Sequence, residues 1–135
     1  MVLDHLFITV NNPDESISFY EQALAPLGFR HVLDYDGADG PEGHPDLKGF
    51  GRDGRVSFWL RQGRSDARSA HVGFVAKSVA EVNAFYEAAL AAGATDNGAP
   101  GARLHDDPRY CAANIFDPDG YSIEVVYKSW QHLVP

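Results

Sequence analysis

The chain has 135 residues, a formal net charge of −8 at pH 7 and an isoelectric point near 5.0. It therefore has the length of one domain, and its charge argues against nucleic acid and anionic membranes as partners. Because no apolar run approaches the roughly 20 residues that span a bilayer, and the single cysteine, Cys111, cannot form a disulfide within the chain, we expect a cytoplasmic protein that binds a small molecule.

The first predicted elements are a strand over residues 3–10 and a helix that begins at Pro13. Asn12 has a side chain that can cap this helix, Glu15 follows three residues later, and proline favours the first helical position. Apolar residues then recur at a spacing near 3.6, which gives the helix one buried stripe. Three strands are predicted after the helix: residues 30–35, a short stretch near Gly49, and residues 55–61.

The elements that follow repeat the first set. An offset of 66 residues places His71 over His5, and the triplet Phe-Tyr-Glu at 85–87 over the same triplet at 19–21. Ser78 then stands where the first helix has its cap residue, so a second helix is expected to begin there. The strands predicted for this second unit are residues 71–76, a weak one near Thr95, residues 110–116, and residues 121–128 after the turn Asp117-Pro118-Asp119-Gly120.

The order of strand, helix and strands thus occurs twice, which predicts an α+β fold built from two βαβββ modules. Two stretches dense in glycine, proline and charge, residues 36–54 and 96–109, are expected to be loops that form the rim of a pocket. The predicted parts of the single domain 1–135 are a first module at 1–61, a polar linker at 62–69 and a second module at 70–128.

Three polar side chains occupy unusual places in this pattern. Alternation along a strand puts His5 on one face with Phe7 and Thr9, and His71 stands at the matching position of the second module. Glu124 lies between two β-branched apolar residues in a strand that should be largely buried, so its carboxylate needs a partner. Two imidazoles and one carboxylate suit a divalent ion such as Zn, Mn, Fe, Ni or Co, and they leave coordination positions open. For either histidine alone, an ordinary hydrogen-bonded strand residue is the competing interpretation.

Three segments resemble the vicinal oxygen chelate superfamily, which includes glyoxalase I, fosfomycin-resistance proteins, bleomycin-binding proteins and extradiol dioxygenases. They are Asp4-His5-Leu6, Ala70-His71-Val72 and the run from Phe116 to Glu124. The resemblance covers nearly the whole chain, and residues 97–101 and 110–113 are similar to a single-domain bacterial subgroup. It implies an open, cup-shaped mixed sheet with helices outside, and often a dimer.

The resemblance also implies that His5, His71 and Glu124 are the metal ligands. The fourth ligand of glyoxalase I, a glutamate that closes the first module, has no counterpart, because Phe58 or Trp59 stands at that position. This difference argues against glyoxalase I activity and is closer to the ligand set of fosfomycin-resistance enzymes and extradiol dioxygenases.

Further residues are predicted to bind substrate. Trp59 and Phe58 would supply an apolar wall, although a strand aromatic is usually core. Phe7 is a further candidate for substrate binding. An arginine at the pocket mouth would fix a substrate carboxylate, although a solvated loop is an equal alternative. The predicted mouth residues are Arg103, His105, Arg109 and Tyr110.

These observations predict a divalent-metal-dependent enzyme of the glyoxalase or dioxygenase type that acts on a small oxygen-rich molecule. Isomerisation or lyase chemistry, thiol addition and ring cleavage with oxygen all stay open. The alternative is a metal-free protein that sequesters its ligand, as bleomycin-resistance proteins do. A homodimer is expected because open sheets leave edges and apolar surface to cover. Both a metal site within one chain and a site shared by two chains stay open.

Overall fold

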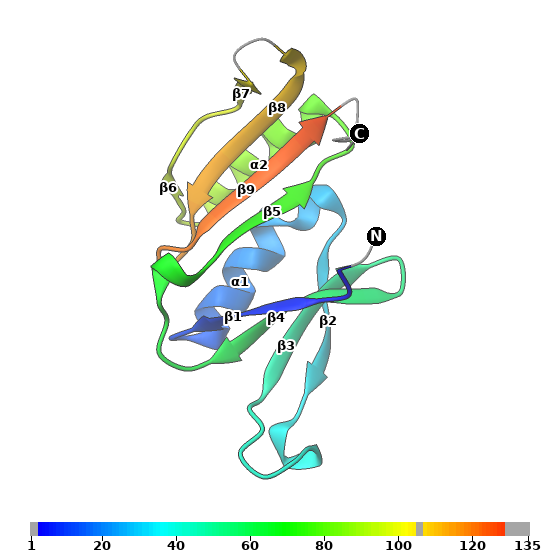
Figure 1. The fold of residues 1–135 in the computed structure, drawn as a ribbon, viewed down its shortest axis with the longest axis vertical. Coiled ribbons are helices and arrows are strands. Elements are labelled where there is room, and N and C mark those ends of the chain that lie inside the picture. Colours follow the sequence, from blue (N-terminus) through cyan, green and yellow to red (C-terminus); the bar gives the residue numbers. More distant parts are fainter. Residues whose placement is uncertain (1–2, 105–106, 129–135) are drawn as a thin grey trace, which may run out of the picture.

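The computed structural model describes residues 3–104 and 107–128, and in the segment 102–109 it describes the backbone alone. Two modules of similar plan follow one another along the chain (Figure 1). The first contains β1 (Leu6–Val10), α1 (Pro13–Ala23), β2 (Arg30–Tyr35), β3 (Leu47–Arg52) and β4 (Arg55–Gln62), with short 3₁₀ turns η1 (Ala25–Leu27) and η2 (Gly37–Asp39). The second contains β5 (His71–Val75), α2 (Val79–Ala91), β6 (Thr95–Asp96), β7 (Gly101–Leu104), β8 (Asp107–Phe116) and β9 (Ser122–Lys128), and is preceded by η3 (Ala67–Ser69).

The predicted α+β fold with two βαβββ modules is confirmed, with two differences in the strands. β1 begins at Leu6, so His5 precedes the strand instead of lying within it. β7 lies inside the stretch 96–109 that was predicted to be a loop, and it pairs with β8 through Gly101 and Ala102. It was missed because a short outer strand needs little apolar alternation and tolerates glycine.

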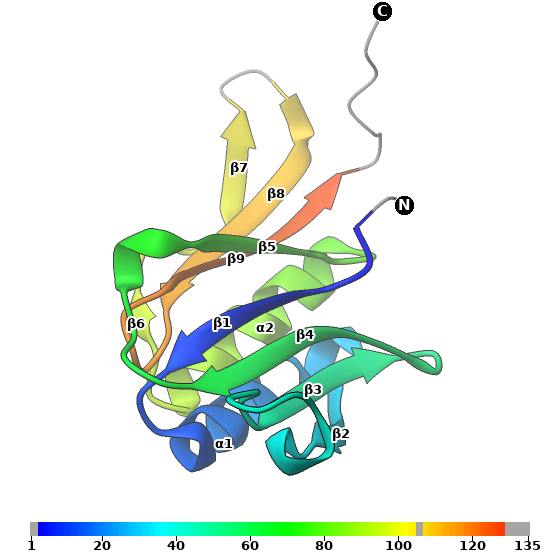
Figure 2. The ribbon, with the colours of Figure 1, turned by 60° about the horizontal axis from the view of Figure 1, so that its bottom comes forward.

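The strands form two hydrogen-bonded sheets, in the orders β1-β4-β3-β2 and β5-β9-β8-β6, with β7 attached to β8. In each sheet the first strand of the module pairs in parallel with the last, so that Phe7 faces Trp59 and Gly73 faces Glu124. Figures 1 and 2 show β1 and β5 as neighbours in space that run in opposite directions. The two histidines that match in the repeat therefore lie at opposite ends of adjacent strands.

Each helix begins where its cap residue predicts. The side chain of Asn12 accepts a hydrogen bond from the backbone N–H of Glu15 at 3.3 Å, and that of Ser78 accepts one from Glu81 at 3.1 Å. The strands lie in front of the two helices in Figure 1. Along β5 buried and exposed residues alternate, which leaves one face of the sheet open. No helix within 3–104 and 107–128 is long and apolar enough to cross a membrane.

A buried hydrogen-bond network joins the two modules. The hydroxyl of Tyr20 on α1 donates to Asp117 Oδ2 at 2.5 Å, and Asp117 Oδ1 accepts from the backbone N–H groups of Asp119 and Tyr121. The hydroxyl of Tyr121 donates in turn to the carbonyl of Thr9 on β1 at 2.6 Å. Asp117 is only 5% exposed, and this burial raises the pKa of its carboxyl group although the hydrogen bonds oppose the shift. The turn before β9 is therefore fixed against the first module.

Candidate functional site

The open face of the second sheet carries a compact polar cluster. Parallel pairing of β5 with β9 sets His71 beside Ser122 and Gly73 beside Glu124. His71 Nε2 lies 3.2 Å from Glu124 Oε1, and His71 Nδ1 is hydrogen-bonded to Ser122 Oγ at 2.8 Å. The side-chain amide of Asn97 donates to the same Ser122 oxygen at 3.4 Å. The cluster thus brings together two of the three predicted metal ligands and two residues that the sequence interpretation missed.

The arrangement places two possible metal-donor atoms next to each other. One imidazole nitrogen and one carboxylate oxygen lie side by side, and both are common donor atoms for divalent transition metals. The hydroxyl on Nδ1 holds the imidazole of His71 so that Nε2 is turned toward Glu124. A Cβ atom added to Gly73 would meet nothing within 4 Å, so the space beside Glu124 is open.

The third predicted ligand, His5, lies elsewhere. It is exposed at the start of β1, where its Nδ1 lies 2.6 Å from Asp4 Oδ1. Asp4 and His5 both precede β1, so strand alternation does not place their side chains on opposite faces. The hydrogen bond to His5 is the main reason that the pKa of Asp4 is lowered.

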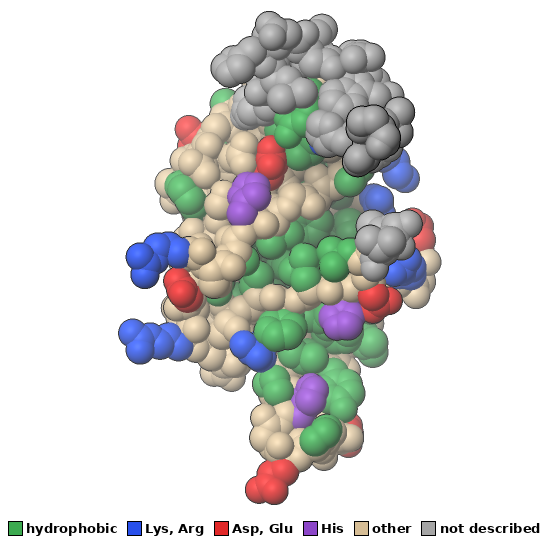
Figure 3. Space-filling model, in the orientation of Figure 1, with side chains coloured by type: hydrophobic (Ala, Val, Ile, Leu, Met, Phe, Trp, Pro, Cys, Tyr) green, Lys and Arg blue, Asp and Glu red, His purple; other side chains and the backbone are tan. Residues whose placement is uncertain are grey.

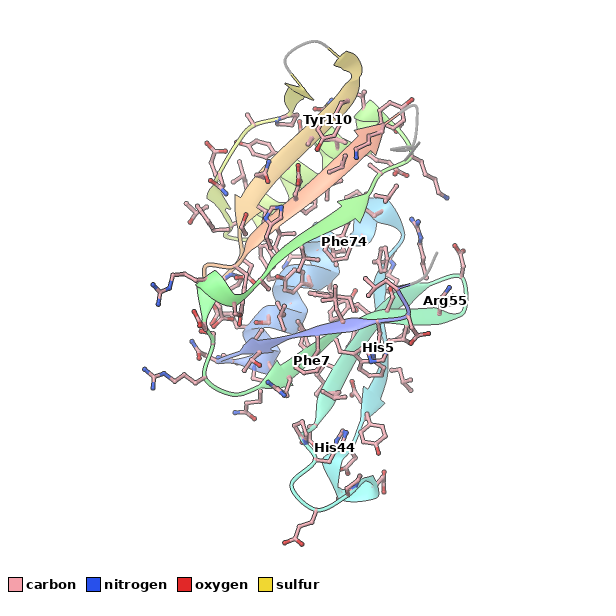
Figure 4. The ribbon with its side chains drawn as sticks, viewed as in Figure 1. His5, Phe7, His44, Arg55, Phe74 and Tyr110 are labelled. Carbon is pink, nitrogen blue, oxygen red and sulfur yellow. The ribbon has the colours of Figure 1, made fainter. Side chains whose placement is uncertain are left out.

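Within the described part of the chain, no group of three or more His, Cys, Asp or Glu side chains is placed to hold a metal ion. In Figure 3 the histidines, in purple, are separated from one another on the face turned to the viewer. Figure 4 labels His5 near the N-terminal end of β1, whereas His71 opens β5, which runs the other way. A single chain in this conformation therefore supplies His71 and Glu124 together and His5 apart from them.

The open face of the first sheet is more apolar. Phe7 on β1 is 46% exposed and stands opposite Trp59 on β4, whereas Phe58 is buried in the core. Because Phe7 and Gly73 match in the repeat, Trp59 occupies the position of Glu124. The register thus decides between Phe58 and Trp59: the tryptophan is on the open face.

The other predicted residues divide into two groups. Tyr110 on β8 is half-buried on the same open face as Glu124, and the ammonium of Lys128 lies 5.0 Å from the centre of its ring. Figure 4 shows Tyr110 on the second sheet, away from His5. The remaining predicted substrate residues lie outside the described side chains: Arg103, His105 and Arg109.

An apolar cleft of about 180 Å³ lies between the two modules. Phe58 of β4 and Phe74 of β5 line it, and their rings are in edge-to-face contact with centroids 5.3 Å apart. Asp4, the partner of His5, and Gly73, the neighbour of Glu124, also belong to its lining. The cleft thus adjoins residues next to both parts of the predicted site.

Comparison with known proteins identifies one family. The family model described as Glyoxalase/Bleomycin resistance protein/Dioxygenase superfamily matches residues 2–125. No protein of curated function matched the chain. Solved structures did match, and they share its fold.

A glyoxalase/bleomycin resistance protein from Albidiferax ferrireducens T118 has 22% identity and a TM-score of 0.76, with 95% of this chain and 99% of that chain covered. A mutant of the fosfomycin resistance protein FosX from Listeria monocytogenes, complexed with Mn(II) and 1S,2S-dihydroxypropylphosphonic acid, has 16% identity and a TM-score of 0.68, with coverages of 94% and 90%. A glyoxalase I mutant from Zea mays has 18% identity and a TM-score of 0.64, with coverages of 92% and 43%.

Proposed function

Since the chain belongs to the Glyoxalase/Bleomycin resistance protein/Dioxygenase superfamily, we propose that it is a divalent-metal-dependent enzyme that acts on a small oxygen-rich molecule. His71 and Glu124 would bind the metal ion, which would be Zn, Mn, Fe, Ni or Co. The complex of FosX with Mn(II) and a dihydroxypropylphosphonic acid supports this class of ligand and substrate.

One observation carries the proposal: His71 Nε2 and Glu124 Oε1 lie 3.2 Å apart on an open sheet face, and the second nitrogen of His71 is held by Ser122. Glu124 is only 18% exposed, and burying a carboxylate is costly unless a hydrogen-bond donor or a cation offsets the lost hydration. The bare backbone at Gly73 leaves room for a ligand beside the pair.

His5 would complete the metal site from a second copy of the chain. Within one chain it is separated from the other two ligands, yet it keeps an exposed imidazole at the matching position of the repeat. The open faces also expose large apolar side chains, among them Phe7 and Val75, which are 46% and 64% exposed. A closed twofold dimer would cover such faces and would create two equivalent sites.

A bound divalent ion would polarise a substrate oxygen and stabilise negative charge that develops on it. The residues of the chain have separate tasks. Ser122 orients the ring of His71, while Trp59 and Phe7 offer apolar surface that excludes water and positions the substrate.

Metal analysis tests this proposal directly. Wild-type protein purified without chelator should contain about one equivalent of metal per chain, whereas Glu124→Gln, which keeps the shape but removes the charge, should lose most of it. Glu87→Gln changes an exposed glutamate on α2 and should keep the wild-type content. Equal metal content in wild type and Glu124→Gln would remove the carboxylate from the site.

Mixed dimers test the origin of His5. Neither His5→Asn nor Glu124→Gln should bind metal fully alone, but when the two are unfolded together and refolded, about a quarter of the wild-type sites should return. This fraction follows because half of randomly paired dimers are mixed, and each mixed dimer has one intact site. No recovery after mixing would place all ligands within one chain.

The alternative function, a metal-free protein that sequesters its ligand, has one observation in its favour. Residues 3–104 and 107–128 of a single chain do not form a group of three metal-binding side chains. The same metal analysis decides between the two functions, because a sequestering protein would bind its ligand fully without any metal.

A further inference from the structure

The open face of the first sheet holds an arginine that the metal proposal does not use. Arg61 on β4 stands opposite Thr9 on β1, and its Nε and Nη2 atoms both donate to Thr9 Oγ1, at 3.2 and 2.8 Å. Its guanidinium carbon lies 4.3 Å from the centre of the Phe7 ring. The hydroxyl and the ring together fix the plane of the guanidinium, so that little side-chain freedom would be lost on binding a ligand.

Arg61 has no acidic partner in the described part of the chain, where every ion pair involves other residues. The chain has 19 aspartates and glutamates against 11 lysines and arginines, so a half-buried cation without a carboxylate is an exception that needs a reason. A guanidinium has five N–H donors, and Thr9 accepts from only two of its nitrogen atoms. Among the residues that the structure describes, no group accepts from its other N–H donors, which can therefore bind an anion.

The second module shows that the fold does not need this cation. Its pairing of Val75 with Val126 corresponds to the pairing of Thr9 with Arg61. Two valines at these positions support the same parallel pair of strands. The arginine and the threonine of the first module are therefore not explained by strand pairing.

Arg61 also lies near a proposed metal ligand. Its guanidinium covers Phe7, which follows His5 by two residues, a separation of about 7 Å along an extended chain. Figure 4 labels Phe7 on β1 and His5 just before the start of that strand. A molecule that binds the metal through vicinal oxygens would thus have a fixed cation and an aromatic surface within its own length.

We propose that Arg61 binds the anionic group of the substrate, and that the substrate is a small molecule with both oxygen ligands and a carboxylate or phosphonate. This inference rests on the proposed function, because it concerns the substrate of the same site. The planar fork of the guanidinium matches two oxygens of either anion. Phe7 and Trp59 would contact the apolar part of the molecule.

Binding of three probes to metal-loaded protein tests the inference: mandelate, phenylphosphonate and the neutral 1-phenylethane-1,2-diol, measured by calorimetry. Wild type should bind at least one anion more tightly than the diol, and the preferred anion identifies the head group. Arg61→Gln should weaken binding of that anion about 10- to 100-fold and leave the diol unchanged. Arg61→Lys, which keeps the charge but not the fork, should fall between them.

Arg64→Gln is the matched control, since it removes the same charge from an exposed residue after β4. The inference is overturned if wild type binds both anions no better than the diol, or if Arg61→Gln binds them as wild type does. Metal content separates this result from a failure of the proposed function. If the wild-type protein binds no metal but still prefers the anion through Arg61, the inference stands and the metalloenzyme is rejected.

Discussion

The two modules share a backbone plan and differ in what they present on their open faces. In the second module the open face carries His71, which is hydrogen-bonded to both Ser122 and Glu124. In the first module Trp59 stands at the position of Glu124, and Arg61 on the same strand donates a hydrogen bond to Thr9 on β1. The buried positions differ far less. The two modules therefore share the character of their cores and differ in the chemistry of their open faces.

The buried positions explain why both modules fold. Phe58 and Leu60 on β4 correspond to Ile123 and Val125 on β9, and all four are at most 2% exposed. Their side chains differ in size but are all apolar, because each sheet must cover one face with its helix. In these two last strands the fold constrains the residues of one face and leaves those of the other face free to differ.

The turns that precede the last strands are the sharpest structural difference. Asp117 is buried and accepts three hydrogen bonds, whereas Asp53 in the corresponding turn of the first module is 87% exposed. Replacing Asp117 by Ala would leave the Tyr20 hydroxyl and two N–H groups without an acceptor. We expect a loss of about 3 to 5 kcal/mol in the free energy of unfolding, measured with urea. Asp53→Ala should change it far less, and equal losses would contradict the comparison.

The same carboxyl group should make stability depend on pH. Burial raises the pKa of Asp117 in the folded protein above its ordinary value. Its contribution to stability is therefore complete below the ordinary aspartate range and is lost as pH rises through the raised pKa. The difference in unfolding free energy between wild type and Asp117→Asn should accordingly shrink over that interval. A difference that grows with pH would mean that the hydrogen bonds, not burial, dominate.

The two histidines differ in their contact with the serine at the matching position of each module. Ser122 is bonded to His71, while Ser57, at the same position of the first module, has no such bond to His5. Ser122→Ala should weaken metal binding about tenfold, which is about 1.4 kcal/mol, because the imidazole loses its orienting partner. Titration of apoprotein measures this affinity. Ser57→Ala should leave it unchanged, and an equal effect of both variants would show a general loss of sheet stability.

The helix caps test the similarity of the modules. Asn12 and Ser78 make the same bond to the residue three positions later. Asn12→Ala and Ser78→Ala should each lower the unfolding free energy by about 1 kcal/mol. Thermal unfolding of the two variants compares them. A much larger loss for one would indicate that the corresponding helix supports more of the shared core.

How much of the structure was predictable depends on the range of the interactions. The caps and the helices were predictable because Asn12 and Ser78 act within one turn, and the strands because alternation is local. The separation of His5 from Glu124 was not, because it depends on the opposite directions of β1 and β5. The functions suggested for Ser122 and Arg61 also required the register of paired strands, which no local pattern contains.

Gly73 has a consequence for the size of ligands at this site. Its backbone is not in the left-handed region, and an added Cβ atom would meet nothing within 4 Å, so neither strain nor crowding at Cβ demands a glycine. The space beside Glu124 is thus open because residue 73 has no side chain. A change to alanine or valine would fill the space beside Glu124 stepwise while the strand stayed intact, so this one side chain would set how large a ligand can lie next to the carboxylate.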